Sequence, residues 1–122
     1  MQWIEGGALA RLLTHEQYQQ LVENGRMGLA GTHDPMPVVK IFTPDAGATW
    51  LLTEIIPDEP ELAFGLCDLG LGCPELGYVH LPELLAIRGK LGLPVERDEH
   101  FRPTMTLQAY ADLAHRYGHI TV

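Results

Sequence analysis

The architecture of the chain follows from residues 38–56, which read Val38-Val39-Lys40-Ile41-Phe42-Thr43-Pro44-Asp45-Ala46-Gly47-Ala48-Thr49-Trp50-Leu51-Leu52-Thr53-Glu54-Ile55-Ile56. Segments 38–43 and 49–56 are rich in β-branched and aromatic residues, which favour strands. Between them, Pro44 presets φ and Gly47 tolerates positive φ, so a turn is expected. The stretch therefore predicts a β-hairpin with a loop of about four or five residues. Hydrophobic and polar residues do not alternate cleanly in either strand, so both faces of the hairpin are expected to be partly covered.

Three more segments are predicted to be strands. They cover residues 62–69, 78–80 and 95–101. The acidic segment Pro57-Asp58-Glu59-Pro60-Glu61 is interpreted as a turn, and the glycine-rich segment 70–77 as a loop. Because these linkers are short, the strands are expected to pair antiparallel rather than through long parallel crossovers.

Helices are predicted before, between and after the strand segments in the sequence. Thr14-His15-Glu16-Gln17 fits a capping box that starts a helix, and Asn24-Gly25 is expected to end it. A short helix is expected at 82–88, and a last helix begins after Thr104 or Thr106 and ends at Gly118. The chain is therefore predicted to be one α+β domain over residues 1–122, with a small antiparallel sheet of about four to five strands and helices on one face.

The composition is that of an ordinary globular protein. Hydrophobic residues make up 46% of the 122 and charged residues 20%. The longest apolar runs are far shorter than the roughly 20 residues of a membrane span, and the first residues lack the pattern of a signal peptide. We therefore expect a cytoplasmic protein with no membrane partner.

The charge of the chain is concentrated in its middle. No lysine or arginine occurs between Lys40 and Arg88, whereas this segment contains eight acids; outside it, acids and bases cancel, so the net charge of -8 belongs to the middle. The eight acids are Asp45, Glu54, Asp58, Glu59, Glu61, Asp68, Glu75 and Glu83. The electrostatic field of such an acidic segment attracts basic surfaces and repels phosphate backbones. This argues against direct binding of nucleic acid.

The acidic middle predicts a non-enzymatic interaction protein with a basic protein partner. A protein that handles nucleic acid is the natural owner of a basic surface, and the acidic face would occupy its phosphate site. The turn at 57–61 and the loop at 68–75 are the expected contact segments. The predicted partner-binding residues are Asp58, Glu59, Glu61, Asp68 and Glu75.

A small metal-dependent hydrolase is the alternative. If residues 95–101 are extended, Glu96, Asp98 and His100 share one face and could supply ligands and a base. The full set for this reaction would be Asp68, Glu75, Glu96, Asp98 and His100. A charged edge strand that resists aggregation is the more ordinary explanation of the same pattern. We therefore expect no metal and no other cofactor.

Two cysteines do not make a disulfide framework. The spacing between Cys67 and Cys73 is wider than the usual spacing of two zinc-binding cysteines. Even with His80 nearby, the set of zinc ligands would be incomplete. Free thiols are expected in a reducing compartment. A serine nucleophile is excluded because the chain contains no serine.

Several blocks resemble a bacterial family known as domain of unknown function 2958. The first block covers residues 37–54; later ones are Phe64-Gly65-Leu66-Cys67-Asp68-Leu69-Gly70, Pro74-Glu75-Leu76-Gly77-Tyr78 and Gly92-Leu93-Pro94-Val95-Glu96-Arg97-Asp98. The resemblance implies a bacterial source and carriage on mobile genetic elements, but no established activity, so it transfers no catalytic residue. Homodimerisation through an exposed strand edge is a further possibility.

Overall fold

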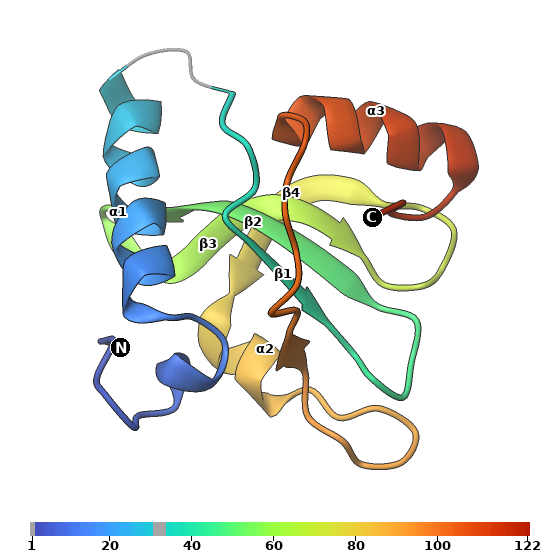
Figure 1. Cartoon of the computed structure of the whole chain (residues 1–122), viewed down its shortest axis with the longest axis horizontal. Coiled ribbons are helices and arrows are strands. Elements are labelled where there is room, and N and C mark those ends of the chain that lie inside the picture. The colour runs from blue at the N-terminus through green and yellow to red at the C-terminus, as the bar shows by residue number, and fades with distance from the viewer. Residues whose placement is uncertain (1, 31–33) are drawn as a thin grey trace.

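A five-stranded antiparallel sheet with helices on both faces forms the domain (Figure 1). The computed structural model describes residues 2–30 and 34–122. The elements in chain order are η1 (Leu9–Arg11), α1 (His15–Ala30), β1 (Val39–Phe42), β2 (Thr49–Ile56), β3 (Glu59–Asp68), β4 (Glu75–His80), α2 (Leu81–Ala86), β5 (Glu96–Arg97) and α3 (Leu107–Tyr117). The strand order is β4-β3-β2-β1-β5, with each neighbouring pair antiparallel. The predicted α+β class and antiparallel sheet are confirmed.

The hairpin predicted at residues 38–56 is confirmed as β1 and β2. Val39 pairs with Leu52, and Phe42 pairs with Thr49. The loop is closed by Thr43, whose amide donates to the Ala48 carbonyl at 3.0 Å. The Ala48 amide donates to Thr43 Oγ1 at 2.9 Å, which satisfies a second backbone group of the loop.

The turn between β2 and β3 is tighter than predicted. It consists of Pro57 and Asp58, and β3 begins at Glu59 rather than at residue 62. Two irregularities interrupt the pairing of β2 with β3, one between Leu52 and Glu54 and one between Ile55 and Ile56. Proline lacks the amide of a regular ladder, so Pro60 is tolerated near the second irregularity.

One face of the sheet is covered by η1, α1 and α2. The sheet contributes Val39, Ile41, Trp50, Leu52, Ile55, Ala63 and Val79 to this core, and the helical side contributes mainly leucines. The leucines are Leu9, Leu12, Leu13, Leu21, Leu81, Leu84 and Leu85.

The opposite face is covered by α3, so helices do not pack on one face alone as predicted. Leu51 and Leu66 of the sheet contact Leu107, Tyr110, Ala111 and Ala114 of α3 in a second core. Successive strand residues point to opposite faces, so the consecutive buried residues Trp50, Leu51 and Leu52 require cover on both sides. The uneven alternation of hydrophobic and polar residues along β2 already indicated that both faces of this strand are covered.

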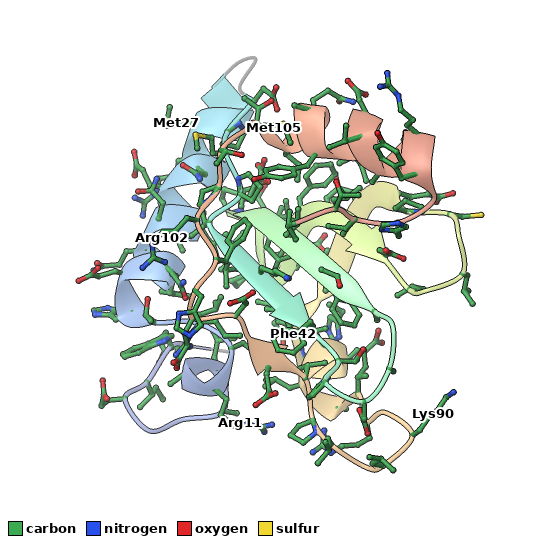
Figure 2. The ribbon with its side chains drawn as sticks, turned by 45° about the vertical axis from the view of Figure 1, so that its right-hand side comes forward. Arg11, Met27, Phe42, Lys90, Arg102 and Met105 are labelled. Carbon is green, nitrogen blue, oxygen red and sulfur yellow. The ribbon has the colours of Figure 1, made fainter. Side chains whose placement is uncertain are left out.

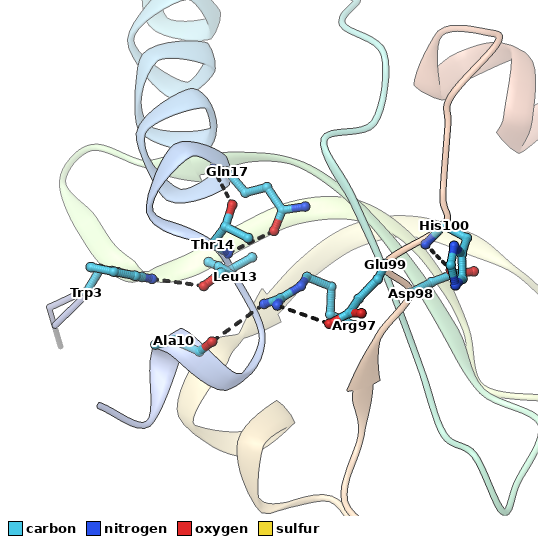
Figure 3. A network of polar contacts seen from close by, with 9 residues as sticks. All are labelled: Trp3, Ala10, Leu13, Thr14, Gln17, Arg97, Asp98, Glu99 and His100. Atoms are coloured by element: carbon cyan, nitrogen blue, oxygen red, sulfur yellow. Dashed lines mark hydrogen bonds and ion pairs between the residues drawn. The ribbon is translucent and has the colours of Figure 1, made fainter. Parts of the chain in front are cut away.

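The start of α1 is the predicted capping box (Figure 3). The Thr14 amide donates to Gln17 Oε1 at 2.9 Å, and the Gln17 amide donates to Thr14 Oγ1 at 3.1 Å. These bonds satisfy two amides that a helix start leaves without partners. Trp3 Nε1 donates to the Leu13 carbonyl at 2.9 Å and ties the preceding segment to the same point.

The predicted end of α1 at Asn24-Gly25 is wrong, because the helix continues to Ala30. Asn24 is buried, and its Nδ2 donates at 2.9 Å to the carbonyl of Thr53, where the β2–β3 pairing is irregular. Gly25 lies directly against the Ile55 carbonyl of β2. The two residues therefore dock the helix on the sheet. Glycine is needed at position 25 because the backbones of α1 and β2 approach closely there, and not because the helix ends in a left-handed cap.

The segment predicted as extended at 95–101 contains only the two-residue strand β5. Asp98 ends it, because its Oδ1 accepts the His100 amide at 2.8 Å and turns the chain (Figure 3). Arg97 connects β5 to η1 through a bond to the Ala10 carbonyl at 3.5 Å.

The caps of α3 agree with prediction. Thr106 Oγ1 accepts the Ala109 amide, and Gly118 ends the helix with φ of 79°. Within the helix, Gln108 Nε2 donates to Asp112 Oδ1 at 3.0 Å.

Candidate functional site

Three of the predicted partner-binding residues lie together at the end of the β2–β3 hairpin. Asp58 belongs to the turn, and Glu59 and Glu61 belong to the first residues of β3. All three are exposed, and within residues 2–30 and 34–122 no ion pair engages their carboxylates. We call these three residues the acidic tip.

The other two predicted residues lie at the opposite end of the same strand pair. Leu62 pairs with His80, whereas Cys67 pairs with Glu75, so Glu75 and Asp68 are far from the acidic tip. Nine residue steps separate Glu59 from Asp68, which corresponds to about 30 Å along a strand. The structure therefore does not bring the five residues into one surface.

Asp68 has a structural role in the described fold. It is only 3% exposed. Its Oδ1 accepts the Gly70 amide at 2.8 Å, and its Oδ2 accepts the Ile120 amide at 3.0 Å. A carboxylate engaged in this way holds the β3–β4 loop and the segment after α3 to the sheet, and is poorly placed to contact a partner. Glu75, by contrast, is exposed at the first residue of β4.

Asp45 is a second acid of the middle segment with an internal role. Its Oδ2 accepts hydrogen bonds from the amides of Leu91 at 2.6 Å and Leu93 at 3.2 Å. These bonds connect the β1–β2 loop to the loop that precedes β5. The surface charge of the middle segment is therefore concentrated on fewer carboxylates than the sequence suggests, and the acidic tip holds three of them.

A cleft of about 370 Å³ lies beside β1, between the segment after β5 and α3. Its polar lining includes Lys40, Asp98, His100, Arg102, Tyr110 and Thr121. Figure 2 labels Arg102 and Met105 on the segment between β5 and α3, and Phe42 on β1. Sequence reasoning missed Lys40, Arg102 and Tyr110, since no motif joins residues so far apart in the chain.

An ion pair lies in the lining of this cleft. Lys40 Nζ lies 3.3 Å from Asp98 Oδ2. The hydrogen bond from the His100 amide lowers the pKa of Asp98, and the nearby Lys40 ammonium lowers it further, whereas burial opposes both. Asp98 thus remains an anion at neutral pH and is paired with Lys40, so it is not available as a general acid.

The residues of the hydrolase alternative do not form a metal centre. Asp68 is buried in backbone contacts, Glu75 begins β4, and Asp98 pairs with Lys40. Within the described part of the chain, no three histidine, cysteine, aspartate or glutamate side chains are grouped as metal ligands would be. The chain turns at Asp98, so the extended segment on which the shared face of Glu96, Asp98 and His100 depended is not formed. Asp98 and His100 line the same cleft, but Glu96 does not.

The two thiols differ in their surroundings. Cys67 is half-buried on β3, and Cys73 is exposed in the following loop. Burial raises the pKa of the Cys67 thiol to about 11. Only about one Cys67 thiol in ten thousand is therefore ionised at pH 7, and the thiolate is the reactive and metal-binding form.

We expect a disulfide reagent at pH 8 to modify Cys73 at least about a hundredfold faster than Cys67, because Cys67 is both less accessible and less ionised. The reaction of Cys67 should accelerate as the pH rises toward its raised pKa. Stopped-flow absorbance on Cys67→Ala and Cys73→Ala variants separates the two rates. Equal rates in the folded variants would contradict this prediction.

The fold and its surface define a small α+β domain with a helix-covered antiparallel sheet, an exposed acidic tip and a charged cleft. This chain belongs to the family described as Protein of unknown function (DUF2958), which matches residues 12–121. No curated protein and no solved structure matches the chain. Among the described residues, no helix has the length and apolar character needed to cross a bilayer.

Proposed function

We propose that this protein is a non-catalytic interaction module whose acidic tip docks on the basic surface of a nucleic-acid-handling protein. The observation that carries the proposal is the exposure of Asp58, Glu59 and Glu61 at the end of one hairpin, without ion pairs inside the described chain. Three carboxylates without ion pairs at the end of one hairpin form a local anionic surface, and lysine or arginine side chains that bind phosphates would complement it.

The sheet supports this role by holding the tip in place. Gly25 of α1 packs on the Ile55 carbonyl and approaches Pro57, so the base of the hairpin is fixed against a helix. Strands β2, β3 and β4 contain no lysine or arginine, so no base within these strands weakens the field around the tip. Carriage on a mobile genetic element, which the family resemblance implies, would place the protein beside partners that handle DNA.

Charge reversal of the tip tests the proposal. The variant Asp58→Lys/Glu59→Lys/Glu61→Lys is expected to weaken partner binding at least about tenfold, because attraction becomes repulsion at the contact. Binding of the unaltered protein is expected to weaken as salt rises from about 50 to 500 mM. The measurement is a tagged pull-down from nuclease-treated bacterial lysate, followed by calorimetry with the purified partner.

The matched control is Glu5→Lys/Glu16→Lys/Glu96→Lys, which changes the net charge by the same amount at three exposed positions outside the tip. If the control variant loses binding as severely as the tip variant, total charge rather than the tip is responsible. A basic partner that binds both unaltered protein and tip variant equally would overturn the proposal. Circular dichroism of both variants checks that they remain folded.

A further inference from the structure

The cleft beside β1 has the dimensions of a small-molecule site. Its volume of about 370 Å³ lies within the range of such sites, which is about 300–1,000 Å³. It is formed by Lys40 of β1, by residues between β5 and α3, by Tyr110 of α3 and by Thr121. These parts meet only in the folded chain, and the acidic tip contributes none of them. A ligand bound here would therefore leave the proposed docking surface free.

The charge in this cleft is opposite in sign to the charge of the whole chain. Its lining includes two bases, Lys40 and Arg102, and one acid, Asp98, so these side chains sum to +1 when histidine is counted as neutral. The whole chain carries -8. At about 0.1 M salt, charges more than about 10 Å away are largely screened, so the nearest groups decide which ligand is favoured. The side chains of the lining therefore favour a ligand with negative charge.

Arg102 is the base of the cleft that retains most of its hydrogen-bond donors. Lys40 is engaged by Asp98, whereas none of the ion pairs within residues 2–30 and 34–122 includes Arg102. Its Nη1 donates to the carbonyl of the neighbouring Phe101 at 2.8 Å. A guanidinium has five N–H donors in a planar fork, and this fork matches two oxygens of a carboxylate or phosphate. Arg102 is therefore placed to bind an oxyanion in the cleft.

Two buried hydroxyl groups belong to the residues that line the cleft. Thr121 Oγ1 is buried and has no hydrogen-bond partner within the described residues. Buried polar atoms are nearly always paired, so this hydroxyl marks a position where a ligand atom would be stabilised. Tyr110 is only 5% exposed, and its Oη accepts the Thr104 amide at 3.0 Å, which holds the ring in place. A fixed tyrosine and an unpartnered hydroxyl in one lining are typical of a preformed polar site.

We propose that this cleft binds a small organic phosphate, whose phosphate group contacts Arg102, Lys40 and Thr121. A phosphate monoester presents three strong acceptor oxygens, whereas a carboxylate presents two. Three acceptors match the guanidinium of Arg102, the ammonium of Lys40 and the unpartnered hydroxyl of Thr121. The organic part of the ligand packs on Phe101 and Met105, which supply apolar lining. The fit to a phosphate monoester therefore combines charge, number of donors and an apolar wall.

Titration of the full chain with phenyl phosphate tests the site, by calorimetry and by two-dimensional NMR. We expect a Kd below about 1 mM, with amide shifts concentrated in residues 98–105 and at Thr121. Benzyl alcohol has the ring without the charge and is expected to bind at least about tenfold more weakly. A Kd for phenyl phosphate above about 1 mM, or equal affinity for benzyl alcohol, would overturn the proposal. Benzoate is the third probe, and tighter binding of benzoate would overturn the assignment of a phosphate.

Removing the guanidinium tests the role of Arg102. Arg102→Ala is expected to weaken phenyl phosphate at least about tenfold, because charge-assisted bonds to the phosphate are lost. Arg116→Ala is the matched control, since it removes the same charge from an exposed position of α3 outside the cleft. Both side chains are exposed, so both variants should remain folded. Equal weakening by the two variants would show that net charge rather than the cleft is responsible, and would overturn the proposal.

Replacing the hydroxyl of Thr121 separates binding from stability. Thr121→Val keeps the size of the side chain and removes a buried hydroxyl that has no partner within the described residues, so Tm is expected to stay the same or rise. The same variant is expected to weaken phenyl phosphate several-fold. Thr121→Ser keeps the hydroxyl and should retain most of the affinity. A Thr121→Val protein that binds phenyl phosphate as tightly as the unaltered protein would overturn the proposed contact.

Discussion

Replacing Gly25 with alanine is expected to lower the free energy of unfolding by about 3 kcal/mol or more. A Cβ at this position would overlap the carbonyl oxygen of Ile55 and crowd Pro57 Cδ. The obstacle is the backbone of β2, which cannot turn away as a side chain could. The helix would therefore have to move off the sheet, which would also break the bond from Asn24 to the Thr53 carbonyl.

Gly28→Ala is the matched control, one helical turn further along α1. A Cβ there would come within 2.6 Å of a carboxylate oxygen of Glu54, which is the end of a side chain and not backbone. Alanine also favours a helix over glycine by up to about 1 kcal/mol, so this variant is expected to be clearly less destabilised than Gly25→Ala. Urea unfolding followed by circular dichroism measures both. A Gly25→Ala variant as stable as Gly28→Ala would show that α1 is not held this closely to β2.

Replacing Gly65 with alanine is the second change of large expected effect, also about 3 kcal/mol or more. Gly65 lies in the middle of β3, opposite Leu52 on one side and Gly77 on the other. A Cβ would overlap the Leu51 carbonyl oxygen and lie 2.9 Å from Leu52 Cα. Both obstacles are backbone atoms of the central strand, so relief would require β2 and β3 to separate.

Gly77→Ala provides the comparison, because Gly77 is the register partner of Gly65 and a Cβ there meets nothing within 4 Å. We expect a change within about 0.5 kcal/mol for this variant. Thermal unfolding by calorimetry distinguishes the two, and the Gly65→Ala protein should also expose its tryptophans earlier on heating. If the two variants melt together, β2 and β3 are not in the close contact described here.

Local sequence signals predicted the elements whose stabilising contacts lie close by in the chain. The hairpin at 38–56, the capping box at Thr14 and Gln17, and the cap at Thr106 all depend on residues a few positions apart. Such contacts form within one turn or one loop, so spacing and residue type suffice to identify them. The family resemblance depended on the same local blocks and is confirmed over residues 12–121.

Local signals failed where a distant contact overrode them. Asn24-Gly25 has the sequence of a helix end, but β2, about thirty residues later, provides the partner that makes both residues part of a continuous helix. In this helix, tertiary contact outweighs intrinsic propensity. The strand expected at 95–101 ends early for a local reason, because Asp98 Oδ1 accepts the amide of His100 two residues later and turns the chain.

The acidic segment between Lys40 and Arg88 shows the same contrast between what the sequence determines and what the tertiary structure determines. Counting residues along the chain establishes the charge asymmetry and its sign. The pairing of β3 with β4 determines that Asp58, Glu59 and Glu61 lie at one end and Glu75 at the other, while burial removes Asp68 from the surface. Net charge is a sum that does not depend on conformation, whereas a binding surface depends on which distant residues the sheet brings together and which it buries.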